Sequence, residues 1–256
     1  MGPHVSVVQH AIADGIGHIT LNRPERMNAV TTELARHLEH ALSELSSSPA
    51  VHAILLRGSG GNFCAGGDVA EVERLRSEGP EGLRTLFVAF HRACDVMATA
   101  EVPVVAAVEG VAMAGGFELM QAADIVLVSD DARIADNHIN FGMIPGGGST
   151  QRLPRLVGQQ IALGLLLSGD RLSGSDAVRL GLAYRSFAPN DFDQGVHDFA
   201  TQLSGRDRAA VTTIKKLVRD PRPRSLSQGF DDEISAVVGH ITGHGVDEFS
   251  RVGTSS

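Results

Sequence analysis

Residues 104–118, VVAAVEGVAMAGGFE, constrain the fold more than any other part of this chain. Val104–Val108 is a short, unbroken apolar run, which is typical of a strand buried on both faces. Gly110 interrupts that run, and residues 114–123 favour a helix. The N–H groups of Gly115 and Gly116 fall in its first turn, where they have no intrahelical partner and a negative oxygen can bind.

Glu118 is the anomalous residue of this segment because its neighbours along the chain are apolar. If the predicted helix is buried, a carboxyl group lies in an apolar wall, and such a group destabilises the fold unless it is used or paired. The alternative is that Glu118 simply points to water.

Strand and helix patterns alternate through most of the chain, as in an α/β domain. We expect residues 1–189 to form a core and residues 190–256, which are helical and polar in pattern, to form a C-terminal helical domain that packs on a neighbouring subunit. Predicted strands are 15–21, 53–56, 104–108, 124–129 and 133–135. Predicted helices are 32–45, 82–99, 114–123, 151–156, 159–167, 176–181, 192–203, 208–218 and 226–241.

Composition excludes several classes of function. A formal net charge of −8, one Tyr and no Trp argue against a nucleic-acid partner. Cys64 and Cys94 provide neither a disulfide framework nor zinc spacing, which favours a reducing, cytoplasmic location. We expect no signal peptide and no membrane segment. His240 and His244 have helical spacing for a metal, but no third ligand is evident, so we expect no metal.

Residues 58–68, GSGGNFCAGGD, form a second glycine-rich loop. It is a poor dinucleotide fingerprint because Phe63 replaces the third glycine and no helix is predicted directly after it. What the loop offers at Ala65, Gly66 and Gly67 is a backbone that a ligand can approach closely, since little side chain intervenes.

Several motifs in this order resemble those of the enoyl-CoA hydratase/isomerase, or crotonase, family. They are the two glycine-rich turns, Asn22-Arg23-Pro24 with Met27-Asn28-Ala29, Ile144-Pro145-Gly146-Gly147-Gly148 with Gln151-Arg152-Leu153, and Leu167-Ser168-Gly169. The resemblance implies a crotonase-like spiral of ββα units with a C-terminal helical oligomerisation domain, a homotrimer or hexamer, and an acyl-CoA thioester substrate. Coenzyme A is then part of the substrate, and no separate cofactor is expected.

The resemblance assigns the oxyanion hole to the backbone N–H groups of Gly67 and Gly115, which would stabilise a thioester enolate. The alternative is that these glycines only satisfy turn geometry. Family hydratases use two glutamates, of which Glu118 matches the first, whereas the second falls on His138. Histidine can act as a general acid or base, and in an extended segment Asp136 would lie on the same side and orient it. The alternative is that His138 only shapes the pocket.

For the substrate itself, the resemblance points to positions on the first two loops and on the helix that often lines the acyl pocket. These candidates are Arg23, Met27, Ala29, Ala65, Asp68, Val69, Leu86, Phe90 and Gly116. Arg23 could equally be a solvated loop charge, and Leu86 and Phe90 could equally be core residues.

The sequence therefore predicts an acyl-CoA enzyme, with syn hydration of a 2-enoyl-CoA as the first hypothesis. Isomerisation, hydrolysis and decarboxylation within the same fold are alternatives, as is a CoA-binding protein with vestigial catalysis.

Overall fold

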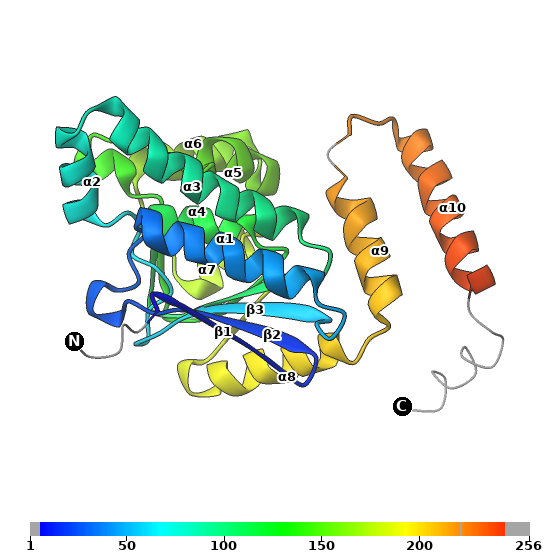
Figure 1. Ribbon diagram of the computed structural model, residues 1–256. Helices are drawn as coiled ribbons and strands as arrows, with labels where there is room; N and C mark the ends of the chain where they lie inside the picture. Colours follow the sequence, from blue (N-terminus) through cyan, green and yellow to red (C-terminus); the bar gives the residue numbers. More distant parts are fainter. Residues whose placement is uncertain (1–5, 221, 244–256) are drawn as a thin grey trace. The chain divides into compact units, whose positions relative to one another are not determined.

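The computed structural model describes residues 6–220 and 222–243, and the chain divides into two compact units at Gly205 (Figure 1). The first unit is built on a six-stranded sheet with strand order β1-β2-β3-β4-β6-β8. Only the β1–β2 pair is antiparallel, and the other neighbours are parallel. The strands are β1 (Val8–Ala13), β2 (Ile16–Leu21), β3 (Ala53–Gly58), β4 (Val104–Val108), β6 (Ile125–Ser129) and β8 (Arg185–Phe187). This α/β architecture agrees with the fold expected from the sequence.

Strand β4 lies inside the sheet, between β3 and β6, and all five of its residues are buried. Val104 pairs with Ile54, and Val105 pairs with Ile125. Because parallel strands here are covered on both faces, β4 reads as a continuous apolar run rather than an alternating pattern. The predicted strand Val104–Val108 is confirmed residue for residue.

A small parallel sheet of β5 (Val111–Met113) and β7 (Arg133–Ala135) stands beside the main sheet. A bridge from Cys64 to Ala112 ties the glycine-rich loop to it. Helix α4 (Gly115–Ala122) starts two residues after β5. The small sheet therefore brings the two glycine-rich turns together.

The helices of the first unit cover the sheet, with α1 and α3 packed side by side (Figure 1). Thr31 caps α1, and its apolar stripe of four leucines is buried as the spacing predicts. These helices are α1 (Thr32–Ser47), α2 (Val69–Ser77), α3 (Pro80–Thr99), α4, α5 (Ser149–Val157), α6 (Gln159–Ser168), α7 (Gly174–Arg179) and α8 (Phe192–Ser204). Three short 3₁₀ turns are η1 (Pro24–Arg26), η2 (His138–Phe141) and η3 (Pro189–Asp191).

Helix α8 belongs to the first unit, whereas the sequence suggested a division near Pro189. Its residues Phe192, Val196 and Ala200 are buried in a second core cluster against the sheet. Apolar side chains of β2, β3, β4 and β6 complete that cluster. The first compact unit therefore extends to Gly205.

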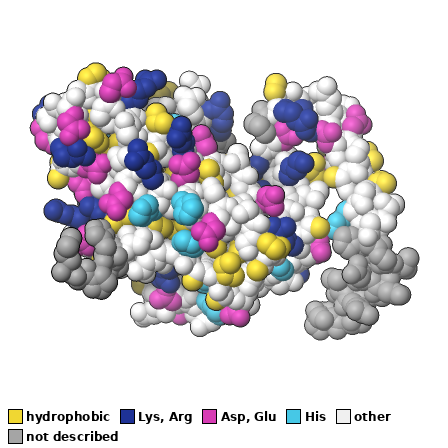
Figure 2. Space-filling view, viewed as in Figure 1, with side chains coloured by type: hydrophobic (Ala, Val, Ile, Leu, Met, Phe, Trp, Pro, Cys, Tyr) yellow, Lys and Arg dark blue, Asp and Glu magenta, His cyan; other side chains and the backbone are white. Residues whose placement is uncertain are grey.

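The second unit consists of α9 (Arg208–Arg219) and α10 (Leu226–Gly243) in the part of the chain that is described. The two helices contact each other, and α10 exposes a stripe of apolar side chains. No helix among the described residues is long and apolar enough to cross a bilayer. On the face shown in Figure 2, basic and acidic side chains of the first unit are interspersed.

Candidate active site

The backbone N–H of Gly67 points away from Val30, the residue with which Gly67 forms a parallel β-bridge. Val30 donates to the Gly66 carbonyl at 2.7 Å, and its own carbonyl accepts from the Asp68 N–H at 2.9 Å. In this parallel bridge the groups of Gly66 and Asp68 face Val30, so the N–H of Gly67 faces the opposite side. Among the described residues no acceptor takes that N–H.

The Gly115 N–H lies at the start of α4, where helix N–H groups have no intrahelical partner. A Cβ built on Gly115 would come within 3.6 Å of the Gly67 nitrogen, so the two turns touch. Ala114, the residue before it, has φ 48° and ψ −116°, which a residue with a side chain adopts only under strain. The structure thus places the two glycine-rich turns, and the N–H groups of Gly67 and Gly115, next to each other.

Gly116, a proposed substrate contact, is buried and packs closely against the glycine-rich loop. A Cβ at this position would lie 2.0 Å from the Cys64 carbonyl oxygen. Only glycine permits that approach of α4 to the loop.

Glu118 does not point to water, because it is only 2 % exposed. Its Oε1 accepts hydrogen bonds from the backbone N–H of Gly147 at 2.6 Å and of Ser149 at 3.1 Å. Its Oε2 makes neither of these bonds. Burial raises the pKa of Glu118 above its ordinary value, although the two N–H donors and the nearby His138 act against that rise.

His138 stands opposite the second oxygen, with its Nε2 3.9 Å from Glu118 Oε2. Its Nδ1 donates to Asp136 Oδ1 at 2.6 Å, and the Asp136 side chain is fully buried. Asp136 therefore selects the tautomer and orientation of the ring and leaves Nε2 for the site. Burial lowers the pKa of His138, but the hydrogen bond to Asp136 and the negative charges of Asp136 and Glu118 outweigh burial and raise it.

The pairing of Asp136 with His138 does not arise from an extended segment, and that premise is wrong. Asn137 turns the chain out of β7, and His138 begins the 3₁₀ turn η2. The two side chains meet because this turn folds the ring back over the strand end. Asp136 Oδ2 is buried without a partner among the described residues, so the carboxylate keeps a second acceptor beside the site.

A family model described as enoyl-CoA hydratase/isomerase matches residues 11–247. The chain belongs to the enoyl-CoA hydratase/isomerase family. It is therefore a crotonase-family enzyme that acts on acyl-CoA.

Known crotonases resemble it along most of their length. A peroxisomal Δ(3,5)-Δ(2,4)-dienoyl-CoA isomerase of Arabidopsis thaliana is 30 % identical over 89 % of this chain and 85 % of its own. A mitochondrial enoyl-CoA hydratase of Pongo abelii is 33 % identical over 84 % of this chain and 72 % of its own. The crystal structure of an enoyl-CoA hydratase from a Polaromonas species has a TM-score of 0.89 and 29 % identity, and covers 94 % of this chain and 96 % of its own.

The loop residues expected to contact CoA form one cluster in this crotonase. Arg23 donates to the Ala29 carbonyl at 2.6 Å and pairs with Asp68 at 2.8 Å, so it is not a solvated loop charge. Burial raises the pKa of Asp68, but its bonds to Arg23 and to backbone N–H groups outweigh burial and lower it. The Ala65 N–H donates to the Met27 carbonyl, which joins the two loops.

Two apolar members of that cluster face outward. Val69 is 82 % exposed and Met27 is 45 % exposed. Val69 begins α2, a helix absent from the sequence prediction, and Asp68 caps it. Apolar side chains held in the open beside this ion pair are typical of a surface that contacts a ligand or another protein.

Leu86 and Phe90 are both buried on α3 and belong to the main core cluster. Phe90 nevertheless adjoins the site, because a Cβ on Gly147 would lie 2.2 Å from its ring. The two readings of Phe90, core residue and pocket wall, are therefore compatible.

Sequence reasoning missed the groups that hold Glu118. The sequence marks the turn around Gly147 and the neighbouring Arg152 only as parts of a family motif, and it assigns no role to Ser149 or Gln121. Arg152 donates to the Gly147 carbonyl at 2.6 Å, and Gln121 donates to the Ser149 hydroxyl at 2.9 Å. Three consecutive glycines ahead of a helix were the signal, since they mark a turn whose N–H groups are accessible.

Neither cysteine of this crotonase suits nucleophilic chemistry. Burial raises the pKa of Cys64 and of Cys94 to about 12 in each case. No group of three or more His, Cys, Asp or Glu in the described ranges could hold a metal, and His244 lies outside those ranges.

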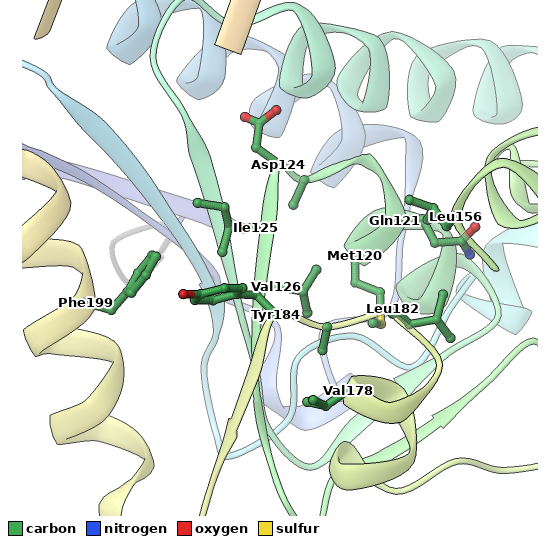
Figure 3. Close-up of a pocket in the computed structure, with 13 residues that line it drawn as sticks. Met120, Gln121, Asp124, Ile125, Val126, Leu156, Val178, Leu182, Tyr184 and Phe199 are labelled. Atoms are coloured by element: carbon green, nitrogen blue, oxygen red, sulfur yellow. The ribbon is translucent and has the colours of Figure 1, made fainter. Parts of the chain in front are cut away.

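A cavity of about 650 Å³ opens elsewhere on the first unit (Figure 3). It lies beside Met120 and Gln121 of α4, and Tyr184 and Phe199 line its far end. Glu118 and His138 do not line it. This cavity is therefore separate from the pair of Glu118 and His138.

Proposed function

We propose that this protein hydrates 2-enoyl-CoA thioesters by syn addition of water. The observation that carries the proposal is the position of Glu118 Oε2 opposite His138 Nε2, 3.9 Å away. Glu118 lies on α4, the same helix that begins with Gly115. A water molecule at hydrogen-bond distance from both groups would be held by a base and by an acid.

In the proposed reaction the thioester carbonyl oxygen accepts from the N–H groups of Gly67 and Gly115. Glu118 removes a proton from the water while the water oxygen bonds to the β-carbon, and electrons move onto the thioester carbonyl oxygen. The two N–H donors stabilise that enolate, and losing one such donor typically costs roughly 10²–10³ in rate. His138, in the charged form that Asp136 stabilises, then donates its Nε2 proton to the α-carbon. Transfer of the proton on Glu118 to His138 Nε2 restores both groups for the next turnover.

Isomerisation is the second candidate, because one relative is named as a dienoyl-CoA isomerase. The same pair of groups would remove a proton from one carbon and return it to another, with no water consumed. Product mass separates the two reactions, since only hydration adds a water molecule.

The test measures turnover of crotonyl-CoA by the wild type, Glu118→Gln and His138→Ala. We expect each substitution to lower kcat by about 10²–10⁴-fold, because each removes one general acid–base group. Mass spectrometry of products from a panel of acyl-CoA substrates identifies the reaction. Equal, negligible rates for all three proteins, with CoA binding intact, would contradict hydration and favour a CoA-binding protein.

We also propose a cytoplasmic location, which two free, buried cysteines support.

A further inference from the structure

The turn before α5 presents three consecutive peptide groups around Glu118. The first and third donate their N–H groups, those of Gly147 and Ser149, to the same carboxylate oxygen. The oxygen of the middle peptide, that of Gly147, points the other way and accepts from Arg152 Nη1 at 2.6 Å. A single guanidinium thus holds the peptide that separates the two donors.

Other bonds hold the later residues of this turn: the Gly148 carbonyl accepts from the N–H groups of Gln151 and Arg152, and Gln121 donates to the Ser149 hydroxyl. Residues 146–148 are all glycine, which loses more conformational freedom on ordering than any other residue. Side chains could not be added to stiffen it. A Cβ on Gly147 would lie 2.7 Å from Glu118 Oε2, and a Cβ on Gly146 would lie 2.4 Å from the Phe87 ring.

Arg152 is placed against the preference of its own helix. It lies in the first turn of α5, where a positive charge is unfavourable to the helix dipole. Its side chain reaches back over Gly148, whose Cβ would lie 2.2 Å from Nη1, and its Nη2 is 3.5 Å from Asp95 on α3. Its position is explained by the turn that it binds and not by the helix that carries it.

We propose that Arg152 is a positioning residue, which locks the glycine turn so that Glu118 keeps one oxygen on two N–H donors and turns the other toward His138. The inference rests on the proposed function for its role in turnover, but its effect on Glu118 is independent of the reaction. Charged or titratable groups face Glu118 from each element around it: His138 from η2, Asp136 from the end of β7, and the thiol of Cys94 from α3.

The experiment follows the Glu118 carboxyl group directly by carbon-13 NMR titration of the full chain labelled at glutamate side chains. The spectrum of Glu118→Gln assigns the signal. Loss of the turn should weaken hydrogen bonds that favour the carboxylate, so we expect its pKa to rise by about one unit in Arg152→Met. Arg152→Lys keeps the charge but only one donor group, and we expect an intermediate rise.

Arg155→Met is the matched control, since Arg155 is an exposed arginine on the same helix that bonds to the Gln151 carbonyl. An unchanged Glu118 pKa in Arg152→Met would overturn the proposal. An equal rise of the Glu118 pKa in Arg155→Met would also overturn it. So would an unchanged Glu118 pKa in Arg152→Lys, because the charge at this position would then explain the whole effect. If Arg152→Met does not fold, Arg152→Lys provides the test: a raised Glu118 pKa supports the proposal, and an unchanged one overturns it.

Turnover separates this proposal from the proposed function. With crotonyl-CoA hydrated by the wild type, the acidic limb of kcat/KM against pH should move up in Arg152→Met by the same amount as the NMR titration. If the wild type turns over no crotonyl-CoA while the NMR shift is present, hydration fails and the positioning role stands.

Discussion

Glu118 and His138 are two groups whose surroundings move both pKa values upward. Burial sets the direction for Glu118, whereas for His138 the contacts with Asp136 and Glu118 overcome burial. A carboxyl group poised above its usual range and an imidazole that stays charged to higher pH suit a base and an acid that work together near neutrality.

The pH profile of kcat/KM should therefore be a bell with both limbs displaced upward. Activity rises as Glu118 loses its proton, above the ordinary 4.5, and falls as His138 loses its proton, above the ordinary 6.5. The measurement is crotonyl-CoA hydration across pH in buffers of constant ionic strength. His138→Gln should abolish the alkaline limb, and a retained limb would assign it to another group.

Local motifs predicted part of this site. Gly67, Gly115 and Glu118 each sit in a short glycine-rich signature, so their neighbours in sequence are also their neighbours in space. Gly147 and Arg152 lie about thirty residues further along, and only the packed fold shows that their backbone and side chain serve Glu118. Hydrogen bonds of that kind leave no periodic trace in the chain.

At the scale of elements, α1 shows how one side chain begins a helix. Thr31 is buried, and its hydroxyl oxygen accepts from the Leu34 N–H at 3.1 Å. The helix then packs along α3 through its leucine stripe.

Thr31→Ala should lower stability by about 1 kcal/mol, because it removes the acceptor for one orphan N–H of the helix. In a domain of this size that corresponds to a fall in Tm of about 2–4 °C, measured by circular dichroism. Ser43→Ala, at an exposed position of the same helix, is the control and should leave Tm within error. Equal Tm values for both variants would show that the cap contributes nothing.

Elements with a clear apolar pattern were predicted, and several elements without one were not. Helices α1 and α3 bury a regular stripe of apolar residues, and β4 buries all five of its residues, which dictates their patterns. Helix α2 buries only Leu75, and β1 exposes five of its six residues, so neither carries a clear signal. Strand β5 has only three residues, and its strand conformation depends on pairing with β7 on one side and with Cys64 on the other.

At the scale of the whole molecule, the apolar stripe of α10 supports the proposal of a homotrimer or hexamer. Its members are 48–59 % exposed, which leaves a continuous apolar surface on the second unit. They are Phe230, Ile234, Val237, Val238 and Ile241.

Light scattering at micromolar concentration should give a mass three or six times that of the 27.0 kDa chain. The double variant Ile234→Glu and Val238→Glu should lower that mass, because two charges would be buried in the contact. Ser235→Glu adds a charge beside the stripe and should leave the assembly intact. A wild-type monomer would contradict the proposal.

The backbone at Ala114 has a consequence for how the protein meets its ligand. A conformation of this kind typically carries roughly 1–3 kcal/mol of strain, which the surrounding structure sustains. The Gly115 N–H is consequently aimed during folding, before any thioester arrives, and ligand binding need not reorganise it. We therefore expect the structures of free and ligand-bound protein to superpose closely at the peptide between Ala114 and Gly115. The conformational entropy of this peptide is then lost once, when the chain folds, and not again in each turnover.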